Sequence, residues 1–235
     1  MTHLAVRPDI DALKRQLMTL TTAARPSAAL LSLGVPAIDQ ALGGGVMANG
    51  FYEIGGPAAA FFAAVLAARR PGHAIWIANR DRAAHLNPFG LPDTGFAPED
   101  LLVATAPGRD VGWAFEQALR TGAARVVVAE AASLPDFAIS RRWRLAAREN
   151  DVLALLLSPE TTRRSQPASA ADARWHAAAQ PNGRFRLALK RNKKGPLGAW
   201  DVAWDGGRVP EEYGGRADGA YGGRNEATHR FRLAN

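Results

Sequence analysis

Cysteine is absent from this sequence of 235 residues, which excludes disulfide bonds and metal sites built on thiolates. Apolar runs long enough to span a membrane are also missing, because Arg, Asp or Gly interrupts each of them. The first eight residues lack the apolar core of a secretory signal. We therefore expect a cytoplasmic protein without a membrane partner.

Histidine is scarce too, and its arrangement offers no site. No two of the five histidines form a helical i, i+4 pair, so we expect no metal centre. They are His3, His73, His85, His176 and His229. His85 near Asp81 lacks a recognisable nucleophile–base spacing, and we expect no catalytic residue of that kind.

Acidic residues are outnumbered only in the C-terminal part of the chain. Residues 1–140 contain 11 Lys/Arg against 12 Asp/Glu, whereas residues 141–235 contain 18 against 10, and the net charge is +7. Such asymmetry is typical of contact with nucleic acid or an acidic partner. It is equally typical of a solvated basic surface.

Five apolar stretches, at residues 51–54, 74–78, 101–104, 126–129 and 152–157, predict buried parallel strands. Helices are expected around residues 58–69 and 110–121, the latter ending at Gly122, and from an Asp136 cap to about Glu149. In the last helix, the arginines at 141, 142, 144 and 148 are expected to form an outer stripe. This alternation predicts an α/β fold with ligands at the carboxyl ends of the strands.

The two ends of the chain differ from this central part. Residues 1–27 contain a predicted short amphipathic helix, residues 28–206 the α/β domain, and residues 207–235 a glycine-rich, flexible basic tail. Within the domain, residues 184–190 and 200–204 alternate apolar with polar side chains around a turn at 191–196, which predicts an antiparallel C-terminal edge. The tail closes with a candidate partner-binding segment, for which a frayed terminus is the alternative: Arg230, Phe231, Arg232 and Leu233.

Residues 51–64 have the strand, glycine turn and helix of a Walker A phosphate loop, but not its chemistry. The turn begins with Gly55, Gly56 and Pro57. The second Gly, the Lys and the Ser/Thr of the motif are then replaced by Phe61, Phe62 and Ala63. Without an ammonium or a hydroxyl group for phosphate and Mg²⁺, we expect a degenerate loop, no cofactor and no ATP hydrolysis.

Three segments resemble the RecA-type ATPases: residues 33–57, which lead into the phosphate loop, residues 125–130, and residues 189–200. The resemblance implies a RecA-like core with a mostly parallel twisted sheet flanked by helices. It also places Glu130 where such folds carry the Walker B acid.

Within that superfamily the chain is similar to the ImuA family. Shared features are the short helix before Leu33-Gly-Val-Pro-Ala-Ile-Asp39, the loop without Lys, the helix at 140–147 and the Trp-rich C-terminal finish. The resemblance implies a non-catalytic adaptor in damage-induced (SOS) translesion DNA synthesis. Its implied partners are an inactive Y-family polymerase homologue of the ImuB type, an error-prone DnaE-type polymerase and a RecA filament.

Basic residues in two segments are candidates for contact with single-stranded DNA, and we expect them near the carboxyl edge of the sheet. They are Arg163, Arg164, Lys190, Arg191, Lys193 and Lys194. Two other functions remain open: a RecA/RadA-like ATPase with an unconventional nucleotide site, and a cell-division inhibitor of the SulA type.

Overall fold

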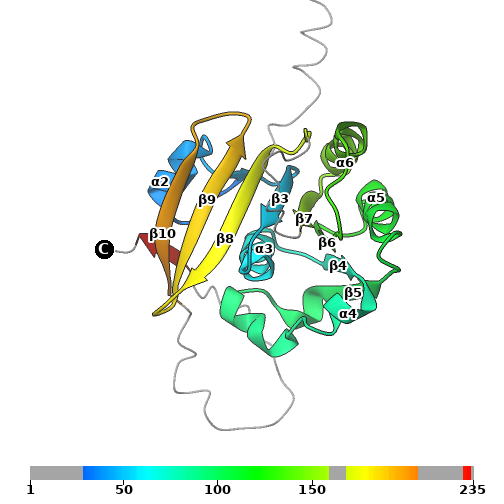
Figure 1. The fold of residues 1–235 in the computed structure, drawn as a ribbon, viewed down its shortest axis with the longest axis horizontal. Coiled ribbons are helices and arrows are strands. Elements are labelled where there is room, and N and C mark those ends of the chain that lie inside the picture. The colour runs from blue at the N-terminus through cyan, green and yellow to red at the C-terminus, as the bar shows by residue number, and fades with distance from the viewer. Residues whose placement is uncertain (1–28, 159–167, 206–229, 234–235) are drawn as a thin grey trace, which may run out of the picture.

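The computed structural model describes residues 29–158, 168–205 and 230–233. Its centre is a twisted nine-stranded sheet in the order β11-β10-β9-β8-β3-β7-β6-β4-β5 (Figure 1). The six strands from β8 to β5 in this order are mutually parallel, and β9, β10 and β11 extend the sheet with antiparallel pairs. The strands are β3 (Phe51–Gly55), β4 (Ala74–Ala78), β5 (Leu101–Thr105), β6 (Val126–Glu130), β7 (Leu153–Leu157), β8 (Ala173–Gln180), β9 (Arg184–Asn192), β10 (Gly198–Asp205) and β11 (Arg230–Leu233).

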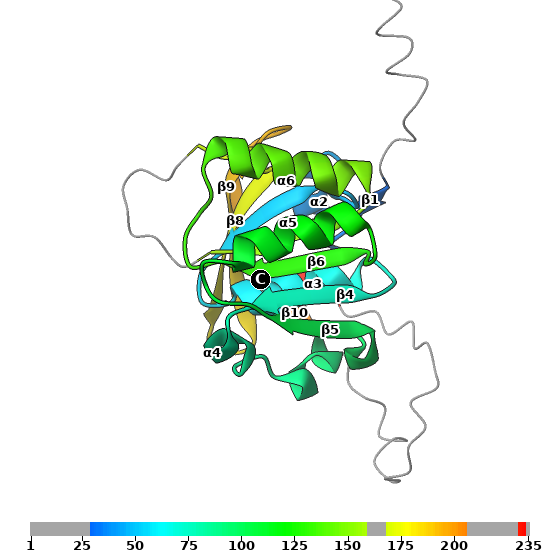
Figure 2. The same cartoon turned by 90° about the vertical axis from the view of Figure 1, so that its right-hand side faces the viewer.

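Helices cover both faces of the sheet. Helix α3 (Ala59–Ala68) packs on the face that carries Tyr52, Ile54 and Trp76. Helices α5 (Val111–Thr121) and α6 (Phe137–Glu149) pack on the other face, against Phe51 and Val127 (Figure 2). The remaining elements are α2 (Pro36–Ala41), α4 (Arg80–Ala83), the 3-10 turns Pro88–Gly90, Pro92–Thr94 and Pro98–Asp100, and the two-stranded pair of β1 (Leu30–Leu31) with β2 (Val46–Met47).

Local sequence signals explain most of these elements. The Asp136 carboxylate accepts the Ile139 N–H at 2.8 Å and caps α6, as predicted. Gly122 has a φ of 61° and ends α5 in the left-handed conformation. Every residue of β7 is buried, because strands and helices surround it on all sides. The α/β fold and its antiparallel C-terminal edge are therefore confirmed.

The predicted buried strand at 101–104 is wrong in its burial. Strand β5 exists, but it is the outer strand of the sheet, with Leu102 62% and Val103 42% exposed. An apolar run of four or five residues has the same appearance in a central strand and in an edge strand. The predicted helix within residues 1–27 lies outside the described residues.

The predicted flexible tail at 207–235 needs correction at its end. Residues 230–233 form β11, antiparallel to β10, and Phe231 is fully buried. Phe231 therefore belongs to the core, so it is not free for a partner as the sequence predicted. Residues 206–229 lie outside the described part of the chain.

Candidate functional site

The degenerate phosphate loop lies at the carboxyl edge of the sheet, between the end of β3 and the start of α3. Gly56 adopts a φ of +95°, and a Cβ at this position would lie 2.3 Å from the Ala177 carbonyl oxygen of β8. Two residues further along the chain, the Ala58 N–H donates to the same oxygen at 3.0 Å. Glycine is required here because the turn lies directly against the neighbouring strand.

A phosphate-binding loop needs backbone N–H groups that point at the ligand. In this turn, Pro57 has no N–H and Ala58 donates to β8. The Ala59 N–H donates to the Gly56 carbonyl at 3.1 Å, and α3 already begins at Ala59. The residues that would form a wide loop around phosphate are instead a tight turn and the first turn of a helix.

Of the two phenylalanines at the glycine and lysine positions of the motif, Phe62 belongs to the core and Phe61 is half-buried against it. Phe62 is 1% exposed and meets the Trp175 ring edge-on, with centroids 5.4 Å apart. Phe61 stacks on Phe185 with centroids 4.5 Å apart and an interplanar angle of 1°. Ala63 is fully buried, so a hydroxyl group there would not reach solvent.

The same phenylalanines contact the C-terminal strand. Phe231 lies 4.8 Å from Trp204, 6.1 Å from Phe62, 6.1 Å from Phe185 and 6.5 Å from Phe61, measured between ring centroids. We name these five residues the aromatic cluster. Its rings meet mostly edge to face, the favoured geometry for aromatic pairs. Strand β11 is therefore anchored on the start of α3.

Glu130 ends β6 near the loop, as the Walker B comparison implied, but its carboxylate has structural partners. The Trp76 indole N–H donates to Oε1 at 2.8 Å, and the Arg82 guanidinium lies 3.6 Å from Oε2. The Glu130 side chain is only 13% exposed. Glu130 thus satisfies a buried indole and links β6 to β4 and α4.

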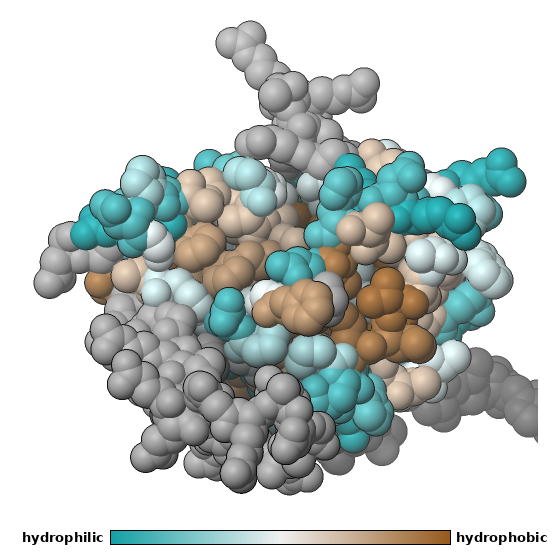
Figure 3. Space-filling view, turned by 90° about the horizontal axis from the view of Figure 1, so that it is seen from below, coloured by the Kyte–Doolittle hydropathy of each residue, from teal (hydrophilic) through white to brown (hydrophobic). Residues whose placement is uncertain are grey.

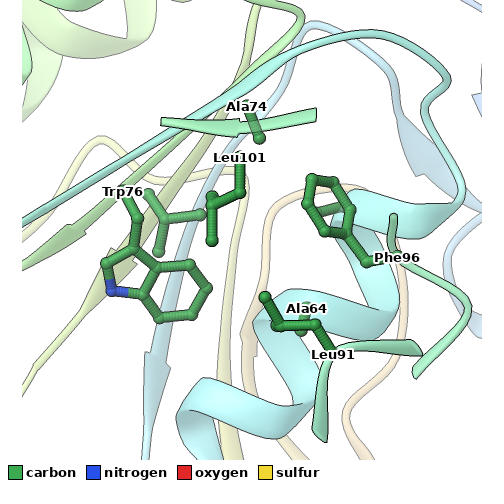
Figure 4. Close-up of a pocket in the computed structure, with 8 residues that line it drawn as sticks. Ala64, Ala74, Trp76, Leu91, Phe96 and Leu101 are labelled. Atoms are coloured by element: carbon green, nitrogen blue, oxygen red, sulfur yellow. The ribbon is translucent and has the colours of Figure 1, made fainter. Parts of the chain in front are cut away.

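A cleft of about 340 Å³ opens at this edge between α3 and residues 82–94. Phe61, Arg82, His85 and Glu130 are among its lining residues. Figure 3 views the molecule from this side and shows hydrophilic and apolar groups mixed on the surface. Deeper in the fold, Trp76, Leu91, Phe96 and Leu101 converge over Ala64 and Ala74 and leave no cavity of measurable volume (Figure 4).

The lysines of the β9–β10 turn lie at the opposite edge of the sheet, so their predicted position is wrong. Asn192 pairs with Ala173, which in turn lies beside Tyr52 near the start of β3. The β9–β10 turn therefore follows the amino ends of the parallel strands, because β9 runs back along β8. Arg163 and Arg164 lie outside the described residues.

The four basic residues at the end of β9 and in the turn after it differ in their surroundings. Lys190 is exposed, and Lys194 donates to the Met47 thioether at 3.2 Å. The Lys193 ammonium donates to the Ala170 carbonyl. Burial, and after it the charge of Arg144, lowers the pKa of Lys193. Within the described residues, Nη1 of Arg191 is buried without a hydrogen-bond partner.

A buried carboxylate, which sequence reasoning missed, organises this edge. Asp172 is 6% exposed and accepts from the Arg144 and Arg148 guanidinium groups at 2.8 and 3.2 Å and from the Phe51 N–H at 3.1 Å. The expected outer stripe is thus wrong for Arg144 and Arg148, while Arg141 and Arg142 are exposed. In the sequence, the burial of Asp172 was indicated only by its position within the short apolar run 170–173.

A second buried carboxylate, Glu53 of β3, forms an ion pair near Asp172. Glu53, 1% exposed, accepts from the Arg174 guanidinium at 2.6 Å and from the Ser169 hydroxyl at 2.5 Å. Burial, with Asp172 nearby, raises the pKa of Tyr52, whose hydroxyl accepts the Met47 N–H at 2.8 Å. Buried charges with full sets of partners are typical of structural networks as well as of active sites.

The described residues contain neither a metal-binding cluster nor a membrane-spanning helix. Across residues 29–158, 168–205 and 230–233, no three His, Asp or Glu side chains lie close enough together to hold a metal ion. Among the helices in those same ranges, none is long and apolar enough to span a membrane.

Comparison with known proteins finds a solved structure with a similar fold. The sequence matches no protein-family model and no curated protein. Among solved structures, the crystal structure of the RadB recombinase is similar, with a TM-score of 0.54 and 14% identity over 74% of this chain and 96% of that chain. At this identity the likeness concerns the fold, and the protein has a RecA-like α/β fold.

Proposed function

We propose that this RecA-like protein is a non-catalytic adaptor in damage-induced translesion DNA synthesis. The observation that carries the proposal is the state of the phosphate loop. Its Ala58 amide donates to the Ala177 carbonyl, Phe62 is buried in the core at the lysine position, and half-buried Phe61 stacks on Phe185 at the glycine position. A fold that has replaced its ligand-binding groups by core contacts is suited to present surfaces to partners.

The resemblance to the ImuA family supplies the partners of this proposal. They are an inactive Y-family polymerase homologue of the ImuB type, an error-prone DnaE-type polymerase and RecA. Co-purification of these proteins with a tagged chain from DNA-damaged cells tests the assignment. Capture of a cell-division protein in their place would support the SulA-type alternative.

Calorimetric titration of the full chain with Mg²⁺-ATP tests the loss of nucleotide binding. We expect no binding at millimolar ATP and no hydrolysis above buffer, because the Ala58 and Ala59 amides are already bonded within the protein and the motif has no lysine. A dissociation constant in the micromolar range, or turnover that requires Mg²⁺, would contradict the adaptor and favour the RecA/RadA-like ATPase. The cleft beside Phe61 and Arg82 is where such a ligand would be sought.

Contact with single-stranded DNA is a separate part of the proposal. If exposed Lys190 neutralises a phosphate, Lys190→Ala will reduce the slope of log K against log salt by about 0.7. Lys193→Ala is the matched control, since the Lys193 ammonium already donates to the Ala170 carbonyl and its loss should leave the slope unchanged. Filter binding of a labelled oligonucleotide across a salt series measures both. Equal slopes in Lys190→Ala and the unmodified protein would remove Lys190 from the interface.

A further inference from the structure

On the side that α5 and α6 cover, the sheet continues beyond these helices through β8, β9 and β10. In Figure 1 these three strands lie in front, with no helix of the described chain over them. Successive side chains of a strand alternate between its two faces, and Phe185 and Trp204 point into the aromatic cluster on the α3 side. Arg184 and Arg186 therefore project from the other side of the sheet. We name the surface of β8–β10 that carries these two arginines the open face.

The pairing of the strands places further charged residues on the open face. Arg186 of β9 lies opposite Asp201 of β10 and donates to its carboxylate at 2.7 Å. Arg174 of β8 alternates with Trp175, which contacts α3, so Arg174 belongs to the open face. Arg191 lies directly opposite Arg174, and directly opposite residues share a face.

The carboxylates described on the open face and at its border with α6 already have arginine partners. Glu53 pairs with Arg174, and Asp201 pairs with Arg186. At the border, Asp172 has two guanidinium partners, both from α6. Positive charge is therefore in excess before the remaining basic residues are considered.

Arg191 and Lys193 add to this excess. After burial, the charges of Arg144, Arg191 and Arg148 lower the pKa of Lys193, so these groups are close enough to repel one another. Arg191 is half-buried, and its Nη1 has no hydrogen-bond partner within the described residues. Guanidinium donors in excess of the carboxylates around them are suited to an anionic ligand.

The apolar residues of the open face favour a nucleic-acid backbone over a protein as this ligand. Protein interfaces depend on aromatic or large aliphatic anchors. In the described part of the chain, none of the exposed large apolar side chains lies on β8, β9 or β10. Phosphate groups need only positive charge and hydrogen-bond donors. The apolar residues of the open face are instead alanines: Ala178, Ala188, Ala199 and Ala203.

The length of the basic surface indicates an extended ligand. Arg184 and Arg191 stand at the two ends of β9, about 23 Å apart along an extended strand. A free phosphate cannot contact both, whereas a flexible polyanion can. The backbone of a duplex winds around its axis once in about 10.5 base pairs, so it leaves a straight row of side chains sooner than a single strand does.

We propose that the open face binds the phosphate backbone of single-stranded nucleic acid through Arg184, Arg186 and Arg191, without regard to base sequence. The proposal rests on the DNA contact in the proposed function and gives that contact a surface. It does not depend on the polymerase partners.

The test is filter binding of a labelled oligothymidylate to the full chain across a salt series. In the triple variant Arg184→Ala, Arg186→Ala and Arg191→Ala, we expect the slope of log K against log salt to fall by about 2, because each lost phosphate contact removes about 0.7. An oligonucleotide of mixed sequence should give the same change. Ala199→Glu, at an exposed position of the open face, should weaken binding about tenfold while all three arginines remain.

A second triple variant is the matched control, because it removes the same charge from the outer side of α5 and α6. It should leave the slope unchanged. Its substitutions, all at exposed positions, are Arg109→Ala, Arg120→Ala and Arg141→Ala.

The outcomes separate this proposal from the proposed function. Absence of binding by the unmodified protein would remove both the DNA contact and this surface. Binding with an unchanged slope in the first triple variant would overturn the open face alone and leave the DNA contact to residues such as Lys190. An equal loss in the control would show that net charge decides binding, and tighter binding of a duplex would contradict the single strand. If circular dichroism shows that the first triple variant is unfolded, undiminished binding by Ala199→Glu would overturn the proposal.

Discussion

Replacing Asp172 by alanine is expected to lower the free energy of unfolding by about 2–4 kcal/mol. Removal of one partner from a buried ion pair leaves the other charges uncompensated, which costs about 3–5 kcal/mol in fully buried cases. The Arg144 and Arg148 side chains are 23% and 27% exposed, so solvent offsets part of that cost. The change also leaves the Phe51 N–H without its acceptor at the start of β3.

Urea denaturation followed by circular dichroism measures this effect. Arg142→Ala is the matched control on the same helix, because its exposed ion pair with Glu116 should contribute at most about 1 kcal/mol. A loss below about 1 kcal/mol for Asp172→Ala would mean that the carboxylate does not hold α6 on the sheet. The expectation would then be wrong even if the hydrogen bonds are present.

Restoring the lysine of the phosphate motif is expected to destabilise the fold and not to restore ATP binding. Phe62→Lys removes a side chain that is 1% exposed and places an ammonium among Trp175 and Phe231. Loss of a buried phenylalanine alone costs about 3–5 kcal/mol, and burial of an unpaired charge adds to it. We therefore expect a loss of at least about 4 kcal/mol and no gain in ATP binding.

Ala60→Lys provides the control for this substitution. Ala60 is exposed on the first turn of the same helix, so the same side chain there should change stability by less than about 0.5 kcal/mol. Thermal unfolding and ATP titration of both variants decide the outcome. A stable Phe62→Lys protein that binds ATP would mean that α3 can reopen into a functional loop.

The central part of the fold could be predicted from sequence because its signals are local. Strands β3, β4, β6 and β7 are short apolar runs. Helix α5 ends at Gly122, and helix α6 begins after its cap residue Asp136. The replacement of glycine and lysine by Phe61 and Phe62 was likewise visible in the motif itself.

What could not be predicted depends on pairing between distant segments. Strand β5 lies at the edge of the sheet because only β4 pairs with it among the described strands. Its apolar sequence alone does not show how many neighbours a strand has. The insertion of Phe231 among Phe61 and Trp204 joins residues 170 and 27 positions apart. The glycine-rich sequence before Phe231 predicted disorder, so the four-residue strand β11 was not predicted.

Part of the candidate site was missed for the same reason. Asp172 has no neighbour in sequence that explains its burial, and its guanidinium partners come from α6, 24 and 28 residues earlier. The turn that carries Lys193 was placed at the wrong edge because β8 was not predicted as a separate strand. With β8 included, the antiparallel β9 returns the chain to the amino edge.

The hydrogen bond between the Ala58 N–H and the Ala177 carbonyl also has a consequence for the lifetime of the complexes that this protein forms. In GTPases and related switches, the element around the terminal phosphate changes shape on hydrolysis and so acts as a clock that ends an association. In this protein the corresponding turn is hydrogen-bonded to the neighbouring strand β8 through Ala58. If the protein hydrolyses no nucleotide, as we propose, its complexes dissociate only at the spontaneous rate, with lifetimes from milliseconds to days.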